Sequence, residues 1–502
     1  MRFLEMLSRK IFIPSGLVIF VLILVGTDPD PSRPEIGRTL AVGALMALYW
    51  ITEAIPLAAT AFLPILLFPV LGIMKGRDVA PLYFNHIVLL LMGGFIIAGA
   101  MQRWNLHKRI ALKIILSIGK SPSRLILGFM AGSWLLSMWV SNTATTMMMT
   151  PIAIALILKL EENGGEGLRR FEIALLLGIA YAASVGGTAT LIGTTPNLVL
   201  AEILLVIFPN APEITFLKWF AFSLPLSFIL VTVIYLVLML LILRRGTFEI
   251  ETSHLEAEYR AMGKPSYEEK VVLVIFALFA LLLMTRADVK IGERVIHGWA
   301  SLFQDPSFID DGTVAIGVAL LLFFFPARSK AGFVLDWGTV RNLPWDIVVL
   351  IGGGFALAGG FHDSGLSAYL GGKLAVLHGF PPIVMVLSIC LLITFLTEIT
   401  SNTATTQVVL PIIGSLSIAL GVNPLLLMVP ATISASCAFM LPVATPPNAI
   451  IFGTHRLRAT DMARVGIYLN IIGAVVITLL LLILGKIVYG IDLGMMPDWA
   501  GK

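Results

Sequence analysis

The sequence predicts an all-α, polytopic membrane protein. Of its 502 residues, 58% are hydrophobic and 13% are charged, and the mean hydropathy is +0.95. Soluble domains carry about a quarter charged residues. Long uncharged runs lack the two-residue alternation of a lipid-facing barrel strand, and backbone groups in hydrocarbon must bond to one another. These long runs, which include 11–25, 224–243, 271–284 and 467–484, are therefore expected to belong to helices of roughly 20 residues each.

The first apolar run is expected to form a retained N-terminal helix. It follows Arg2, Arg9 and Lys10, as in a signal peptide, but no cleavage site of the Ala-x-Ala kind comes after it. The net charge of +4 arises from short basic clusters between apolar runs, which are typical of topology signals and not of a nucleic-acid surface. With these clusters and the N-terminus in the cytoplasm, the C-terminus is expected outside.

One polar hexapeptide occurs twice in this apolar chain. Ser-Asn-Thr-Ala-Thr-Thr stands at 141–146 and returns unchanged at 401–406, 260 positions later. The pentapeptide Gly-Thr-Thr-Pro-Asn at 193–197 likewise corresponds to Ala-Thr-Pro-Pro-Asn at 444–448. These repeats indicate two homologous halves.

The second half is expected to be inverted relative to the first. The orientation above requires the segments around the two hexapeptides, about 123–160 and 383–420, to enter and leave on the same side as re-entrant hairpins. An odd number of membrane crossings then separates equivalent positions in the two repeats, so one repeat is upside down relative to the other. Inverted repeats of this kind occur in secondary transporters. The expected divisions are an N-terminal helix at 1–36, a first repeat at 37–245, a cytoplasmic linker at 246–267, a second repeat at 268–488 and a C-terminal tail at 489–502.

The repeated motifs suit a binding site. Ser, Asn and Thr oxygens can hold a hard cation, and the free N–H groups of a following helix can hold an anion. Packing explains a single Ser or Thr in an apolar helix, but it rarely requires the same six residues twice. Proline disfavours helix in the residue before it, so 193–196 and 444–447 are expected to interrupt helices and expose carbonyl ligands.

These motifs resemble those of the divalent anion/sodium symporter family. The resemblance rests on the paired Ser-Asn-Thr tips, the broken helices, ASCAFMLPVATPPNAII at 435–451 and TEAIPL at 52–57, and it covers essentially the whole chain. It implies about eleven transmembrane helices plus two re-entrant hairpins, a homodimer with one substrate site per protomer, and an elevator-type movement.

The resemblance also implies the site residues. Sodium site one is expected at Ser137, Ser141, Asn142 and the carbonyl of Gly193, and sodium site two at Thr397, Ser401, Asn402 and the carbonyl of Ala444. The expected substrate-binding residues are Ser141, Asn142, Thr143, Ser401, Asn402, Thr403, Thr194, Thr445 and Pro446.

Two residues near these motifs have roles that the sequence leaves open. Thr195 stands where many relatives have proline, which affects either substrate preference or the stiffness of the break. Glu398, beside the second tip, is either a partner of a neighbouring helix or a group that tunes the tip or carries a proton.

We therefore expect sodium-coupled symport of C4-dicarboxylates such as succinate, malate and fumarate, across the inner membrane of a bacterium. One ionised side chain at membrane depth costs roughly 2.5 to 3.5 kcal/mol. The motifs hold no Lys or Arg, so bound sodium is expected to compensate the dianion, at least two ions for each.

Several alternatives remain open on this fold or near it. Exchange of dicarboxylates or citrate and transport of sulfate would use the same fold, and a channel could use the same neutral oxygens. An intramembrane enzyme is disfavoured because the apolar runs contain no HExxH, GxSxG or paired aspartate motif. No cofactor and no nucleic-acid partner is expected.

Overall fold

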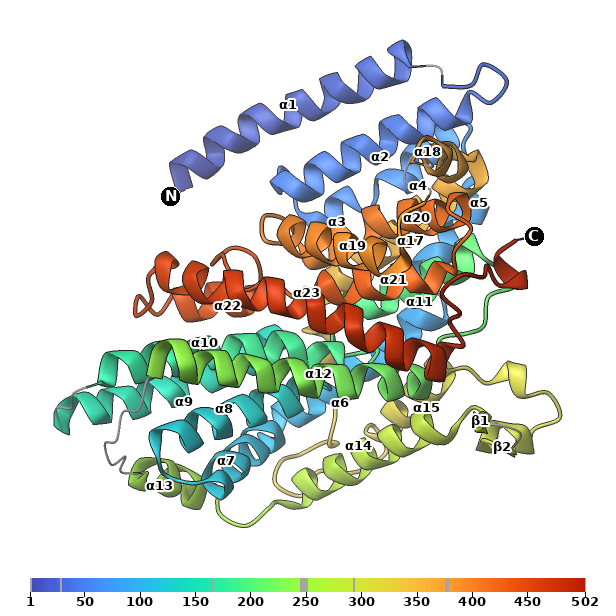
Figure 1. Cartoon of the computed structure of the whole chain (residues 1–502). Helices are drawn as coiled ribbons and strands as arrows, with labels where there is room; N and C mark the ends of the chain where they lie inside the picture. Colours follow the sequence, from blue (N-terminus) through green and yellow to red (C-terminus); the bar gives the residue numbers. More distant parts are fainter. Residues whose placement is uncertain are drawn as a thin grey trace.

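The computed structural model describes residues 2–27, 29–163, 167–243, 252–291, 294–374 and 379–501. Residue 245, residues 246–251 of the expected linker and residue 502 of the expected tail lie outside these ranges. Within them the chain is a bundle of helices whose long axes run across Figure 1, with the two termini at opposite ends.

The helices fall at the following bounds. The first part of the chain contains α1 (Arg2–Gly26), α2 (Glu35–Thr52), α3 (Leu57–Thr60), α4 (Leu63–Val70), α5 (Gly76–Val79), α6 (His86–Arg103), α7 (Leu106–Ile118), α8 (Pro122–Ser137), α9 (Asn142–Asn163), α10 (Leu168–Thr188), α11 (Thr195–Ile207) and α12 (Phe216–Leu238). The second contains α13 (Ser253–Ala261), α14 (Tyr267–Thr285), α15 (Asp311–Leu321), α16 (Trp337–Arg341), α17 (Trp345–Ser364), α18 (Leu366–Leu374), α19 (Pro382–Thr397), α20 (Asn402–Ala419), α21 (Pro424–Ser434), α22 (Pro446–Phe452) and α23 (Ala459–Tyr489).

The apolar composition produces several membrane spans. Among the described residues, 6 helices are long and apolar enough to cross a membrane, and further apolar helices of 10–17 residues accompany them. The chain is therefore a multi-pass membrane protein. In α10 an apolar stretch of 18 residues is 94% buried, so this helix lies inside the bundle. It contacts α8, α9 and α12.

One element departs from the expectation of helices alone. Strand β1 (Val289–Ile291) pairs antiparallel with β2 (Arg294–Ile296) in the connection after α14. The all-helical expectation was wrong here, because it rested on apolar runs long enough to span a bilayer. A short connection rich in β-branched residues can pair its backbone as a hairpin instead.

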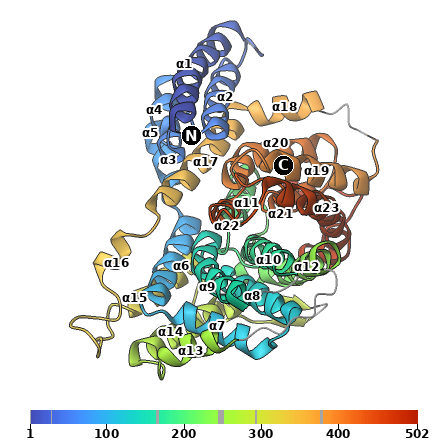
Figure 2. The same cartoon turned by 90° about the vertical axis from the view of Figure 1, so that its left-hand side faces the viewer.

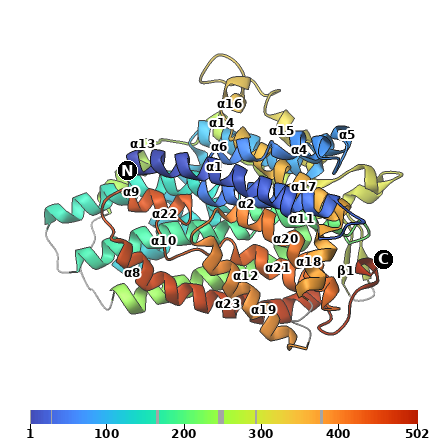
Figure 3. The ribbon, with the colours of Figure 1, turned by 90° about the horizontal axis from the view of Figure 1, so that it is seen from above.

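The helices form two groups. Figure 2 shows α1 to α6 with α14 to α17 along one side, and α8 to α12 with α19 to α23 gathered on the other. Seen from above, α1 runs beside α2 along the bundle (Figure 3), and the two helices are in contact. We call the first group the frame and the second, which carries both hexapeptides and both pentapeptides, the core body.

One close approach joins the frame to the core body. A Cβ at Gly354 of α17 would collide with the side chain of Gln407 on α20. Without that Cβ, Gln407 is fully buried against α17 and donates from Nε2 to the carbonyl of Leu350 at 2.9 Å. The glycine thus permits a hydrogen bond across the boundary.

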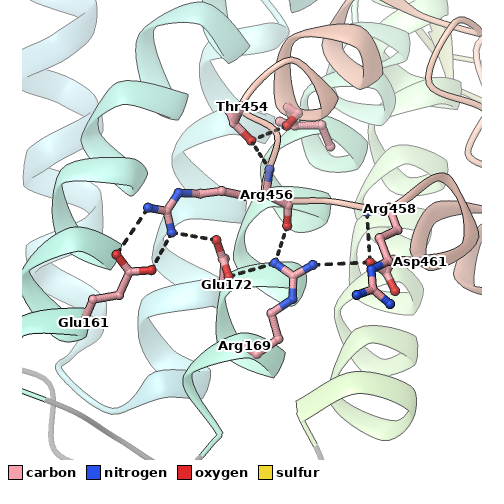
Figure 4. Close-up of polar contacts among 8 residues, drawn as sticks. Glu161, Arg169, Glu172, Thr454, Arg456, Arg458 and Asp461 are labelled. Atoms are coloured by element: carbon pink, nitrogen blue, oxygen red, sulfur yellow. Dashed lines mark hydrogen bonds and ion pairs between the residues drawn. The ribbon is translucent and has the colours of Figure 1, made fainter.

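An ion-pair network ties the base of the first hairpin to the second half of the chain (Figure 4). Arg456, between α22 and α23, contacts Glu172 of α10 at 2.9 Å and Glu161 of α9 at 2.8 Å. Arg169 contacts the other oxygen of Glu172 at 3.0 Å and Asp461 at 3.7 Å. The Glu172 side chain is only 6% exposed, so it depends on these two cations.

Arg456→Gln is expected to lower the free energy of unfolding by about 2 kcal/mol, because it leaves a buried carboxylate with one cation instead of two. Thermal unfolding in detergent, followed by size-exclusion chromatography, measures the change. Arg170→Gln removes an exposed cation from the same end of α10 and is the matched control. Equal melting temperatures for both variants would contradict the stabilising role of the network.

Candidate functional site

The two hexapeptide tips lie in one cavity of about 660 Å³. Of the residues expected at the site, those lining it are Ser141, Asn142, Thr143, Gly193, Thr194, Ser401, Asn402, Thr403, Ala444, Thr445 and Pro446. The remaining two, Ser137 and Thr397, are fully buried immediately before the tips. Segments 260 positions apart in the sequence therefore meet at one place.

Each tip is a gap between two helices of a hairpin. α8 ends at Ser137 and α9 begins at Asn142, while α19 ends at Thr397 and α20 begins at Asn402. In both tips the hydroxyl that ends the first helix donates to Oδ1 of the asparagine that begins the second. The bond from Thr397 to Asn402 is 2.7 Å long. The two tips thus share one hydrogen-bonding plan.

The bases of the two hairpins lie near different parts of the chain. Lys120, just before α8, pairs with Glu256 of α13 at 2.8 Å, and α9 also contacts α13. A Cβ at Gly414 of α20 would lie 3.2 Å from Ile207. The next residue, Phe208, packs edge-to-face against Trp499 in the C-terminal tail. The first hairpin therefore starts near α13 and the second near the C-terminal tail.

The first break brings a backbone carbonyl to the first tip. α10 ends at Thr188 and α11 begins at Thr195, and the six residues between them contain Gly193. A Cβ at Gly187 would collide with Asn142 Oδ1 and would lie 3.0 Å from the Gly193 carbonyl oxygen. These two oxygens therefore face one small space that Gly187 keeps open. The donor set, neutral oxygens from a hydroxyl, an amide and a carbonyl, fits a hard cation such as sodium.

Two buried asparagines hold the breaks in shape. Asn197 donates from Nδ2 to the carbonyls of Gly187 at 3.2 Å and Thr190 at 2.7 Å. Asn448 makes the equivalent bonds, to the carbonyls ten and seven residues before it, at 3.1 and 3.0 Å. The sequence interpretation assigned them no role, although an asparagine ends both pentapeptides, and that recurrence is the signal that identifies them.

The junction between tip and break differs in the two halves. Glu398 is 3% exposed, and its carboxylate accepts from the three backbone N–H groups at 439–441 at 2.7, 2.9 and 2.9 Å and from Asn470 of α23 at 2.7 Å. In the first half Met138 takes the equivalent position, and its carbonyl accepts from the Thr190 hydroxyl. Glu398 is therefore a partner of the second break and of α23.

The electrostatics of the cavity favour an anion held by dipoles. Glu53, at the end of α2, is the one ionisable side chain among the described residues that line it. The first N–H groups of α9 and α20, at Asn142, Thr143, Asn402 and Thr403, precede the first intrahelical bonds, so both helices present donors and a positive dipole end. The next N–H of α9, at Ala144, is bonded to Ser141 Oγ at 3.3 Å. No group of three or more His, Cys, Asp and Glu that could hold a metal occurs in the described residues. The described tip and break residues that line the cavity offer a cation neutral oxygens.

Comparison with models of known families identifies the family of this chain. A model of the sodium:sulfate symporter transmembrane region matches residues 10–491. The chain belongs to this family. The family expected from the sequence motifs is therefore confirmed, and the protein is a transporter and not an enzyme.

Curated relatives of this family are similar along nearly their whole length. The sodium-dependent dicarboxylate transporter SdcS of Staphylococcus saprophyticus is 42% identical over 486 residues, covering 95% of this chain and 91% of that protein. SdcS of Staphylococcus aureus strain NCTC 8325 is 42% identical over 487 residues, with the same coverage.

Solved structures support the fold alone. The YdaH transporter of Alcanivorax borkumensis has a TM-score of 0.54 at 13% identity, covering 98% of this chain and 99% of that chain. MtrF of Neisseria gonorrhoeae has a TM-score of 0.54 at 15% identity, covering 89% and 94%. Both share the helical architecture of a membrane transporter with this protein.

Proposed function

We propose that the protein is a sodium-coupled symporter of C4-dicarboxylates such as succinate, malate and fumarate. The observation that carries the proposal is the meeting of both Ser-Asn-Thr tips and both breaks in one cavity. The relatives at 42% identity, which bear the name of sodium-dependent dicarboxylate transporters, support the choice of ion and substrate.

Two sodium ions are assigned to the two tips. Site one consists of Ser137, Ser141, Asn142 and the carbonyl of Gly193, and it is supported by the oxygens that converge in front of Gly187. Site two consists of Thr397, Ser401, Asn402 and the carbonyl of Ala444, and it is supported by the matching bond between the Thr397 hydroxyl and Asn402 Oδ1.

The substrate is placed between the tips. One carboxylate binds Asn142 and Thr143 at the start of α9, and the other binds Asn402 and Thr403 at the start of α20. Ser141, Ser401, Thr194, Thr445 and Pro446 complete the wall. Because the cavity wall has no Lys or Arg among its described residues, sodium supplies the positive charge, and the dianion binds well only to the sodium-loaded protein.

Alternating access is assigned to an elevator-type movement of the core body against the frame. We assign the chain about eleven transmembrane helices and two re-entrant hairpins in inverted repeats, within an inner-membrane homodimer, as the family resemblance implies. The N-terminus lies at the end of the bundle where α13 lies, opposite the C-terminus, which fits a cytoplasmic N-terminus and an outer C-terminus (Figure 1). The cavity reaches Ile51, Thr52 and Glu53 at the end of α2 nearer the N-terminus, which supports an opening of the site toward the cytoplasmic side.

Uptake by proteoliposomes tests this function. Labelled succinate is expected to accumulate above its external concentration when an inward sodium gradient is imposed, and potassium is expected not to replace sodium. A parallel batch contains internal succinate without sodium. Uptake in that batch alone would establish an exchanger, and loss of saturation and accumulation would indicate a channel. Labelled citrate and sulfate, measured in the same way, test the remaining substrates.

A further inference from the structure

Thr195 makes a hydrogen bond that crosses between the two halves of the site. Its hydroxyl is bonded to the hydroxyl of Thr403, which belongs to the second tip. Thr195 is the first residue of α11 and is half-buried, and both residues line the cavity. The bond therefore joins the first break to the second tip beside the space assigned to one substrate carboxylate.

The equivalent place in the other half has no hydroxyl. Pro446 follows Thr445 as Thr195 follows Thr194, and it too lines the cavity. α11 contacts α20, and α22 contacts α9, so in both halves the helix that follows the break lies against the second hairpin helix of the opposite half. The substrate space consequently has one flank with an additional hydroxyl and one flank with a proline ring.

We propose that Thr195 is a specificity-determining residue that favours C4-dicarboxylates with a hydroxyl on the carbon next to one carboxylate, such as malate, over unsubstituted ones such as succinate. This inference rests on the proposed function. It assigns the hydroxylated end of the substrate to the second tip, with Pro446 beside the unsubstituted end.

The preference follows from hydrogen-bond exchange. A carboxylate at the second tip takes the hydroxyl of Thr403 as a donor, because a bond to a charged acceptor is the stronger one. The Thr403 hydroxyl then no longer donates to Thr195, whose own hydroxyl turns to donate to the Thr403 oxygen and keeps a lone pair without a donor in a partly buried site, which is unfavourable. A substrate hydroxyl on the adjacent carbon donates to that lone pair, and an unsubstituted substrate cannot. Since Thr195 is only half-buried, the discrimination is expected to be about tenfold and not the much larger factor of an enclosed site.

Competition for labelled succinate uptake in proteoliposomes with an inward sodium gradient tests the proposal. The quantity measured is the ratio of the half-inhibitory concentrations of unlabelled succinate and malate. Wild-type protein is expected to favour malate, and Thr195→Val is expected to reduce that ratio about tenfold. Thr195→Ser keeps the hydroxyl and is expected to retain the ratio.

A second variant covers the case in which valine prevents folding. Thr195→Pro also removes the hydroxyl and copies the residue at the equivalent position of the other half, and proline is well accepted as the first residue of a helix. The same loss of the ratio is expected.

The outcomes separate this inference from the proposed function. A wild-type protein without sodium-dependent succinate uptake would overturn the proposed function. Uptake with an unchanged ratio in Thr195→Val or Thr195→Pro would overturn the specificity role alone. An equal loss of affinity for both substrates would also overturn it, because Thr195 would then serve the shape of the break.

Discussion

Asn142→Ala and Asn402→Ala are each expected to reduce sodium-driven succinate uptake at least about a hundredfold. In the proposed site each asparagine binds a sodium ion through Oδ1 and a substrate carboxylate through its donors. Hydrogen bonds to charged groups contribute about 1.5 to 3 kcal/mol each, so losing two of them corresponds to two or more factors of ten.

Both variants are expected to remain folded. Each asparagine is half-buried at the start of a helix and not in the apolar packing of the bundle, so the change in stability is expected to stay near 1 kcal/mol. Uptake, melting temperature and size-exclusion profile are measured together. Asn342→Ala, at an exposed position after α16, is the control for the substitution itself. Normal uptake by either variant would show that the substituted tip does not form part of the binding site.

Gly187→Ala is expected to abolish uptake at ordinary sodium concentrations. The new methyl group would collide with Asn142 Oδ1 and crowd the Gly193 carbonyl, so it would occupy the space assigned to the first sodium ion. The fold is expected to be retained, because alanine favours a helix by about 1 kcal/mol over glycine and offsets part of the crowding.

The chain offers a matched control for this glycine. Gly473 lies in α23 and has no neighbouring heavy atom within 4 Å of the position a Cβ would take. Gly473→Ala is therefore expected to transport normally. For Gly187→Ala, the initial rate is measured over a wide range of sodium concentrations. An unchanged sodium dependence would show that the space in front of Gly187 holds no coupling ion.

The candidate site was largely predictable because its polar hexapeptide occurs twice in the sequence. An identical polar hexapeptide in an apolar chain identifies both tips without knowledge of their contacts, and proline identifies both breaks. Ser137 and Thr397 came from the family resemblance, and their position one helical turn before each tip agrees with it. The residues that support the tips were harder to identify. Asn197 and Asn448 act through backbone carbonyls seven to ten residues away, and such bonds follow no helical or strand spacing.

The roles of Glu398 and Thr195 depended on contacts between distant segments. Glu398 binds backbone groups 41 to 43 positions further along the chain, and Thr195 bonds to a residue 208 positions away. No local pattern predicts such partners. The small β-hairpin after α14 was not predicted because its residues show no long apolar run, and the pairing of its two strands is not marked in the sequence.

The sequence by itself determined the class of the protein and the identity of its binding motifs. The hydrophobic composition predicts a membrane protein, and the need for backbone hydrogen bonds within the membrane predicts helices. The repeated sequences identify the motifs. The tertiary structure decided that both tips and both breaks face one cavity, that Gly187 lies against Asn142 Oδ1 and the Gly193 carbonyl, and that Thr195 lies against Thr403. The reason is physical: periodicity and composition act over a few residues, whereas a site between two halves depends on how whole helices pack.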